Sequence, residues 1–217
     1  MVVATAKAVE SIDMVAVATD SEEVAKVCDS YGIKSVMTSK DHTSGTDRIN
    51  EAATRLGLDD NEIVINVQAD EPFIEANIIE RLKTLVKRNV KDESVMICSA
   101  YKSITAQQAK NPNLVKVVTD ESNFALYFSR SLIPYDRDGG YEEYKGHIGI
   151  YGFTKKMLQR FCSLPPSTLE KTEKLEQLRA LSHGFKIAMC QVETKSFGID
   201  TPEDLEIALK HLNAPKN

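Results

Sequence analysis

Short apolar runs alternate with amphipathic stretches along the first half of the chain. The apolar runs are rich in Val, Ile and Ala and are bounded by polar or glycine positions, as expected of buried strands. These strands are predicted at residues 14–19, 33–38 and 63–67. Helices are predicted at residues 1–10, 21–31, 46–56 and 74–89. Strands that alternate with helices in this way indicate β-α-β units and a mostly parallel sheet.

The second half of the chain follows a different pattern. Strand-like runs succeed one another with short polar turns, which indicates antiparallel or mixed strands. They are predicted at residues 94–101, 114–119, 125–129, 147–153 and 185–192. A loop rich in Asp, Gly and Tyr covers residues 134–146, and Ser167 and Glu170 have the spacing of a capping box that opens a helix. With no internal repeat or low-complexity linker, the pattern favours one α/β domain.

Composition narrows the class of protein. The chain has 217 residues, of which 42% are hydrophobic, and a net charge of −5. Since no Lys/Arg cluster is present, a phosphate-tracking nucleic-acid surface is not expected. Cys28, Cys98, Cys162 and Cys190 are scattered and form no C-x-x-C pair, which disfavours a zinc or redox site and fits reduced thiols in the cytosol. No apolar run reaches the ~18 residues of a membrane span, and the first ten residues read as a helix, not a signal peptide.

Acidic residues follow the strand predicted at 63–67. Asp70 and Glu71 stand just beyond it, where the carboxyl end of a central strand faces the ligand crevice in α/β proteins. A carboxylate there can hold Mg²⁺, which in turn carries substrate phosphates. Asp200 also follows an apolar segment and precedes a predicted helix. A solvated loop or a helix-capping acid is the alternative for each, and Asp20 has the same ambiguity.

Several polar side chains elsewhere are candidates for binding. The segment 42–48 combines small polar residues, a glycine and an arginine ahead of a helix, which suits an anionic or polar ligand but equally an ordinary N-cap loop. Arg130 at a strand end suits a carboxylate, although a solvated arginine is the simpler reading. His147 and Tyr151 share a glycine-containing strand. Without a Walker or G-x-G-x-x-G motif, the residues alone indicate an α/β protein that binds an anionic, metal-chelated ligand.

Seven segments, taken together and in this order, carry a resemblance to a known family. They are SGTDR (44–48), NVQADEP (66–72), NPNLVKVV (111–118), YFSR (127–130), HIGIY (147–151), LEQLR (175–179) and GIDTPED (198–204). The combination closely resembles the 3-deoxy-manno-octulosonate (Kdo) cytidylyltransferases over essentially the whole chain.

The resemblance implies a Rossmann-like nucleotidyltransferase fold with a mixed, mostly parallel central sheet and a small antiparallel excursion. It implies a single domain over residues 1–217, with an inserted dimerisation and sugar-side region around 120–165. The implied reaction transfers CMP from CTP to the anomeric hydroxyl of Kdo and releases pyrophosphate, with Mg²⁺ as cofactor. A cytoplasmic homodimer that serves lipopolysaccharide biosynthesis, with no nucleic-acid or membrane partner, is expected.

Matching positions assign roles to individual residues. Asp70 and Asp200 are expected to be catalytic and to hold Mg²⁺. The sugar pocket is expected to contain Arg48, Gln68, Arg130, His147, Tyr151, Glu176 and Gln177. The cytidine is expected to face His42, Thr43, Ser44 and Gly45. Glu176 and Gln177 are read as part of a helix, where a polar flank is the simpler alternative. The sugar hydroxyl would attack the α-phosphorus in line, with positioning as the main contribution of the pocket; the general base is left open.

Two departures from the family pattern stand out. Ala69 occupies a position that is usually Gly in the family. Family members also begin with a strand and a Pro-Ala-Arg-type phosphate loop, a segment of about 25–30 residues on the scale of a β-α-β unit, whereas this chain starts at the following helix. An upstream start is therefore expected. The alternatives are a cytidylyltransferase for another acidic sugar, such as a sialic acid, or an inactive binding protein.

Overall fold

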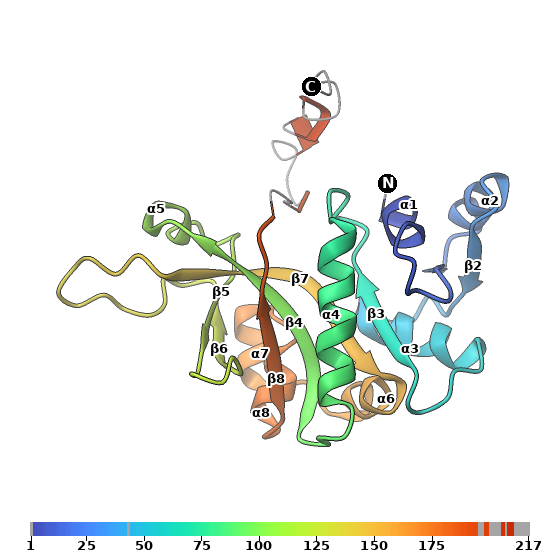
Figure 1. Ribbon diagram of the computed structural model, residues 1–217. Helices are drawn as coiled ribbons and strands as arrows, with labels where there is room; N and C mark the ends of the chain where they lie inside the picture. The colour runs from blue at the N-terminus through green and yellow to red at the C-terminus, as the bar shows by residue number, and fades with distance from the viewer. Residues whose placement is uncertain (1, 43, 195–197, 200–204, 207, 211–217) are drawn as a thin grey trace.

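A six-stranded mixed sheet lies between two layers of helices in the computed structural model (Figure 1). The structure describes residues 2–42, 44–194, 198–199, 205–206 and 208–210. The strands are β1 (Ala16–Thr19), β2 (Lys34–Met37), β3 (Ile63–Val67), β4 (Val95–Ile104), β5 (Lys116–Thr119), β6 (Ala125–Ser129), β7 (Tyr144–Thr154) and β8 (Lys186–Gln191). The helices are α1 (Val2–Lys7), α2 (Glu22–Ser30), α3 (Gly45–Arg55), α4 (Ala76–Asn89), α5 (Ala106–Ala109), α6 (Lys155–Ser163), α7 (Thr168–Glu173) and α8 (Leu178–Ser182).

Strand β7 organises the central sheet. It lies between β3 and β4 and runs antiparallel to both, while β8 pairs with β4 in parallel. At the other end of the sheet, β5 pairs antiparallel with both β7 and β6. It follows that β3, β4, β5 and β8 share one direction and β6 and β7 run the opposite way. The predicted mixed α/β fold, with an antiparallel component in the second half of the chain, is confirmed.

Strands β1 and β2 form a separate parallel pair. Figure 1 shows this pair beside α2 and α3, on the side of the molecule where α1 also lies. Strand β3 pairs with β7 along one edge, and among the described residues no strand pairs with its other edge. The two parts are therefore connected through the packing of α1 and α3 and through the chain itself, not through a shared ladder of hydrogen bonds.

Apolar side chains cover both faces of the sheet. On one face, α4 contributes Ile78, Ile79, Leu82 and Val86, all at most 3% exposed, which repeat at helical spacing as the sequence predicted. Gly152 on β7 allows this close approach, because a Cβ at that position would lie 2.6 Å from Cγ2 of Val86. Burying one such aliphatic side chain contributes roughly 1.5–3 kcal/mol.

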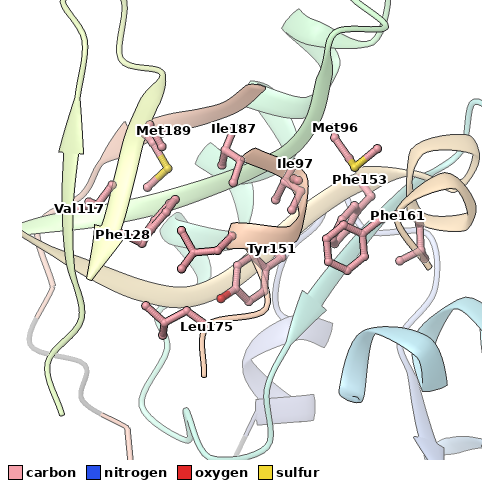
Figure 2. Packing of buried hydrophobic residues seen from close by; sticks show 14 of the residues in the cluster. Met96, Ile97, Val117, Phe128, Tyr151, Phe153, Phe161, Leu175, Ile187 and Met189 are labelled. Carbon is pink, nitrogen blue, oxygen red and sulfur yellow. The ribbon is translucent and has the colours of Figure 1, made fainter. Parts of the chain in front are cut away.

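The second cluster fills the opposite face, against α6 and α8. Figure 2 shows its side chains, including Phe128, Tyr151, Phe153 and Phe161, with the polar end of Tyr151 within an otherwise apolar group. Because Tyr151 is only 9% exposed, its hydroxyl needs a protein or ligand partner. This requirement connects the core to the polar residues described below.

The sequence reading was wrong at several places, and it also did not predict the short helix α5. Residues 155–163 form α6, which was not predicted, although Met157, Leu158 and Phe161 give the segment an apolar side. Strand β7 begins at residue 144, within the predicted loop 134–146. The residues 176–177 lie in a turn and not inside a helix, because Lys174 adopts a left-handed conformation (φ 55°, ψ 45°) that ends α7.

Glycines and a capping box mark several helix ends. Gly32 and Gly57 have positive φ at the ends of α2 and α3, and the predicted capping box of Ser167 and Glu170 opens α7. The four cysteines are free thiols. Within the described ranges, every helix is too short or too polar to cross a membrane.

Candidate active site

Three aromatic rings form a wall: His147 and Tyr151 lie on β7, and Phe128 lies on β6, which is separated from β7 by β5. The ring centroids of His147 and Tyr151 are 5.6 Å apart, and Phe128 contacts the His147 ring edge-on at 5.0 Å. Burial lowers the pKa of His147 to about 3, so the imidazole is neutral at pH 7. Burial also raises the pKa of the Tyr151 phenol, with the negative charges of Glu176 and Asp70 adding to the effect. The wall therefore presents neutral hydrogen-bonding groups.

The turn between α7 and α8 brings an acid and an amide to this wall. The Thr46 hydroxyl donates to Oε2 of Glu176 over 2.8 Å, and the Tyr151 hydroxyl donates to Oε1 of Gln177 over 3.3 Å. Burial raises the pKa of Glu176. The side chain of Arg179 neutralises part of this charge, since its Nη2 lies 3.9 Å from Oε1 of Glu176.

Two polar atoms in this turn are buried and have no hydrogen-bond partner among the described residues: Oε1 of Glu176 and Nε2 of Gln177. Buried polar side-chain atoms in folded proteins nearly always have a partner. An unpaired acceptor and an unpaired donor on adjacent residues match a ligand that carries several hydroxyl groups, since each hydroxyl both donates and accepts.

The end of β3 lies against β7 at Gly149. A Cβ at Gly149 would lie 3.6 Å from Nε2 of Gln68 and 3.7 Å from Oε1 of Glu71. Asp70 is exposed, and its carbonyl accepts a hydrogen bond from the N–H of Ile199 over 2.8 Å. The structure thus brings Gln68 and the 70–71 acids to the same edge as His147 and Tyr151, as the sequence predicted for the carboxyl end of β3.

The oxygen donors at this edge fit a magnesium ion that is held mainly by substrate phosphates and water molecules. Among the described residues, no group of three His, Cys, Asp or Glu side chains could hold a metal ion, and the predicted ligand Asp200 lies outside them. Mg²⁺ is usually held by one or two carboxylates together with substrate phosphates. The exposed Asp70 at a strand end, joined by a backbone hydrogen bond to the residue before Asp200, is compatible with such a site.

The loop before α3 is fixed by contacts with the carboxylate of Glu51. Its carboxylate accepts from the N–H of Ser39 over 2.9 Å and pairs with Nε2 of His42, and these contacts lower its pKa to about 2. Ser44 caps α3 by accepting from the N–H of Asp47. A Cβ at Gly45 would have no neighbouring atom within 4 Å among the residues that the structure describes. The loop is therefore fixed at its base and open above; Thr43 lies outside the described residues.

The two predicted arginines occupy other positions. Arg48 binds the Asp20 carboxylate over 3.1 Å and the Thr38 hydroxyl over 2.7 Å, at the ends of β1 and β2. Arg130 donates from Nε to the Glu173 carbonyl over 2.9 Å and from Nη1 to the Pro112 carbonyl over 3.3 Å. None of these bonds joins either guanidinium to the wall on β7.

Two residues of the site carried no assigned role in the sequence reading. Thr46 is the partner of Glu176 across 130 positions of sequence, a contact that no local pattern reveals. Ser99 is fully buried on β4 and bonds His147. Its only signal is a hydroxyl in the apolar run at 95–100.

Comparison with known proteins gives consistent matches. Residues 1–187 match the family model described as cytidylyltransferase. A 3-deoxy-manno-octulosonate cytidylyltransferase from a Nitratiruptor species is 56% identical over 206 residues, which cover 95% of this chain and 86% of the relative. The enzyme of the same name from Wolinella succinogenes is 52% identical over 214 residues, covering 97% of this chain and 88% of the relative.

Solved structures agree with these matches. The structure of CMP:2-keto-3-deoxy-manno-octonic acid synthetase complexed with CTP has a TM-score of 0.89 at 37% identity, and the match covers 98% of this chain and 87% of that one. The 4-diphosphocytidyl-2C-methyl-D-erythritol synthase has a TM-score of 0.62 at 11% identity, which supports the fold alone. The expected nucleotidyltransferase fold is thereby confirmed.

Proposed function

Since the chain belongs to the cytidylyltransferase family, we propose that it transfers CMP from CTP to Kdo and releases pyrophosphate. The names of the relatives support Kdo over a sialic acid as the sugar. Kdo is an acidic sugar with several hydroxyl groups, so the pocket must hold both a carboxylate and hydroxyls. The product would serve lipopolysaccharide biosynthesis.

The proposal rests on two buried polar atoms in the turn after α7 that have no hydrogen-bond partner among the described residues. Oε1 of Glu176 accepts and Nε2 of Gln177 donates, and both are buried beside Tyr151. A sugar with neighbouring hydroxyls satisfies both atoms at once. A flat apolar ligand would leave them unsatisfied, which costs about 1–3 kcal/mol for each group. The cluster therefore selects a polyhydroxylated substrate.

We assign the metal to the edge at the end of β3. Asp70 and Asp200 would hold Mg²⁺, which offsets charge on the triphosphate and on the leaving pyrophosphate. Asp70 is exposed, as a group that meets phosphates through a hydrated ion should be. Asp200 directly follows Ile199, whose N–H binds the Asp70 carbonyl, so the chain connection favours a joint site.

The residues of the chain itself contribute mainly by positioning. The anomeric hydroxyl of the sugar attacks the α-phosphorus, and the bond from that phosphorus to the pyrophosphate oxygen breaks. Tyr151, Glu176 and Gln177 hold the sugar through its hydroxyls, so that the attacking oxygen is aligned before the reaction. Gln68 lies at the boundary between the sugar and the acidic edge.

The remaining assignments concern the nucleotide and the sugar carboxylate. The open loop at His42, Thr43, Ser44 and Gly45 would face the cytidine, because it is fixed at its base by Glu51 and free above Gly45. A guanidinium suits the Kdo carboxylate. Arg130 is the better candidate of the two arginines, since Arg48 already pairs with the Asp20 carboxylate.

We further propose a cytoplasmic homodimer that forms through the region around 120–165. Large apolar side chains are exposed there: Leu126 is 61%, Leu132 37% and Tyr135 83% exposed. Figure 1 shows the connection from β6 to β7 as a long loop that extends away from the sheet. The free thiols fit a reducing compartment. Sedimentation equilibrium tests the dimer, and a monomer at assay concentrations would contradict it.

Pyrophosphate release tests the function. CTP, Kdo and Mg²⁺ are mixed with the 217-residue chain and, in parallel, with a chain extended upstream to the length of the relatives. Release that depends on all three components supports the proposal. Absence of turnover in both chains, or faster turnover with a sialic acid than with Kdo, would overturn it.

A further inference from the structure

A bulge in β7 creates an unusual environment beside His147. In the ladder between β4 and β7, Ser99 pairs with Tyr151 and the next residue, Ala100, pairs with Ile148. Gly149 and Ile150 are therefore extra residues on β7. Bulges leave ladder groups without their regular partners and often redirect side chains next to active sites. Here the Ser99 side chain lies against the bulge.

The hydroxyl of Ser99 has three neighbours. Its Oγ lies 2.8 Å from the Ile150 carbonyl, 3.5 Å from the Ile148 carbonyl and 2.9 Å from Nε2 of His147. A hydroxyl has one hydrogen to donate, and a carbonyl can only accept. The short distance favours donation of this hydrogen to the nearer carbonyl, Ile150, which leaves the oxygen lone pairs for His147. In that arrangement, Nε2 of His147 carries a hydrogen and donates it to Ser99.

This bond determines what the other ring nitrogen can do. A neutral imidazole has one N–H, so Nδ1 of His147 is an acceptor. Phe128 and Tyr151 flank the ring, and among the described residues no hydrogen bond to Nδ1 is formed. The acceptor thus remains for a ligand. The same wall holds Tyr151, whose hydroxyl binds Gln177.

We propose that Ser99 is a positioning residue, which holds His147 in the Nε2–H tautomer so that Nδ1 accepts a hydrogen bond from a hydroxyl group of the sugar acid. This inference rests on the proposed function for the identity of the ligand. It adds to the sugar pocket a residue from β4, and it gives His147 a defined role as a neutral acceptor. A charged imidazole or an Nδ1–H donor would not serve that role.

The tautomer is measured directly in the ligand-free protein. The ¹⁵N chemical shifts of the two ring nitrogens distinguish the Nε2–H, Nδ1–H and charged forms of a histidine. The chain has four histidines, so comparison with His147→Gln identifies the signals. We expect Nε2–H for the wild type and a shift of Nδ1 when Kdo is added. An Nδ1–H or charged ring, or an unchanged Nδ1 with saturating Kdo, would overturn the inference.

Substitution then tests the role of Ser99. Ser99→Ala removes the acceptor of the Nε2 hydrogen, so we expect a mixture of tautomers and about tenfold weaker Kdo binding by calorimetry, with CTP binding within about twofold of wild type. Ser99→Thr keeps the hydroxyl and should restore the Nε2–H signal. Ser103→Ala is the matched control, because Ser103 is exposed on the same strand and bonds Gln191. Equal weakening of Kdo and CTP binding, with the tautomer unchanged, would indicate a structural role only.

These measurements separate the inference from the proposed function. Ring shifts and Kdo binding need no turnover, whereas the function is tested by pyrophosphate release. If the chain binds Kdo through Nδ1 but releases no pyrophosphate, the inference is supported and the proposed function is contradicted. If the chain turns over normally with an Nδ1–H ring, the proposed function is supported and the inference is contradicted.

Discussion

The two halves of the candidate site differ in how they are built. The residues at the wall on β7 are buried or half-buried, and their polar groups are fixed by bonds between segments far apart in sequence, such as Thr46 with Glu176. The acidic edge at the end of β3 is exposed, and Asp70 lies on a loop. This difference in exposure indicates different roles for the two parts of the site. On the proposed function, the buried and fixed groups would align the sugar, while the exposed carboxylates would meet a hydrated ion and its phosphates.

Stability and activity should therefore respond differently in the two halves. A change at the buried wall disturbs both the folded state and the sugar, because the same hydrogen bonds serve both. A change at the exposed edge should alter turnover and leave the fold intact. Four substitutions test this contrast.

The largest effect is expected at the acidic edge. Asp70→Asn removes a charge that would hold the metal, and kcat should fall by at least about a hundredfold, the scale of a lost electrostatic contact to a transition state. The melting temperature should stay close to wild type. The control is Asp60→Asn at the opposite end of β3, where the side chain is exposed. A wild-type rate in Asp70→Asn would remove this residue from the metal site.

At the buried wall, Thr46→Val tests the support of Glu176. The substitution keeps the shape of a side chain that is 3% exposed but deletes the donor to Glu176. The free energy of unfolding should fall by about 1–3 kcal/mol, and KM for Kdo should rise while KM for CTP holds. Thr54→Val, on the exposed side of the same helix, should change neither quantity appreciably. Unchanged stability would contradict the buried bond.

A smaller effect is expected for Tyr151→Phe. It deletes the hydroxyl that donates to Gln177 and keeps the ring within the core. A neutral hydrogen bond contributes about 0.5–1.5 kcal/mol, so KM for Kdo should rise about three- to tenfold. Tyr31→Phe serves as control, since Tyr31 is 76% exposed. An equal rise of KM for CTP would remove Tyr151 from the sugar side.

The smallest effect is a pH dependence of stability at Glu176. Burial raises its pKa in the folded chain, so the folded state binds a proton more tightly than the unfolded state. Stability from this group is therefore present at low pH and is lost as the pH rises from the unfolded pKa through the folded pKa. The variant Glu176→Gln does not lose this stability, because the glutamine side chain does not ionise. Urea unfolding of both proteins from about pH 4 to pH 7 should show the variant gaining stability relative to wild type; a constant difference would contradict the burial argument.

Sequence reasoning recovered the parts of this site that depend on local pattern. The strand before Asp70, the helix predicted at residues 46–56 and the shared strand of His147 and Tyr151 follow from local periodicity, which neighbouring residues determine. Gly32 ends α2 with a positive φ, and glycine is the residue that signals this conformation.

The parts that it missed depend on tertiary contacts or on rare backbone conformations. Lys174 has the same left-handed conformation as Gly32, but lysine does not signal it, so residues 176–177 were read as helical. The bulge opposite Ser99 and the bond from Thr46 to Glu176 join distant segments. The pairing of Arg48 with Asp20 likewise connects α3 to the end of β1. Such contacts are set by how elements pack, which a single sequence does not reveal.

The separate pair of strands β1 and β2 has a consequence for local opening. Its backbone hydrogen bonds are not shared with the six-stranded sheet, and an isolated two-stranded pair is only marginally stable in water. Amide hydrogens of Val17 and Val36 should therefore exchange with deuterium faster than those of Ile97 and Cys98, which lie in the central sheet. The end of the molecule that carries the Asp20–Arg48 pair should open as a unit of its own, at a lower free energy than global unfolding.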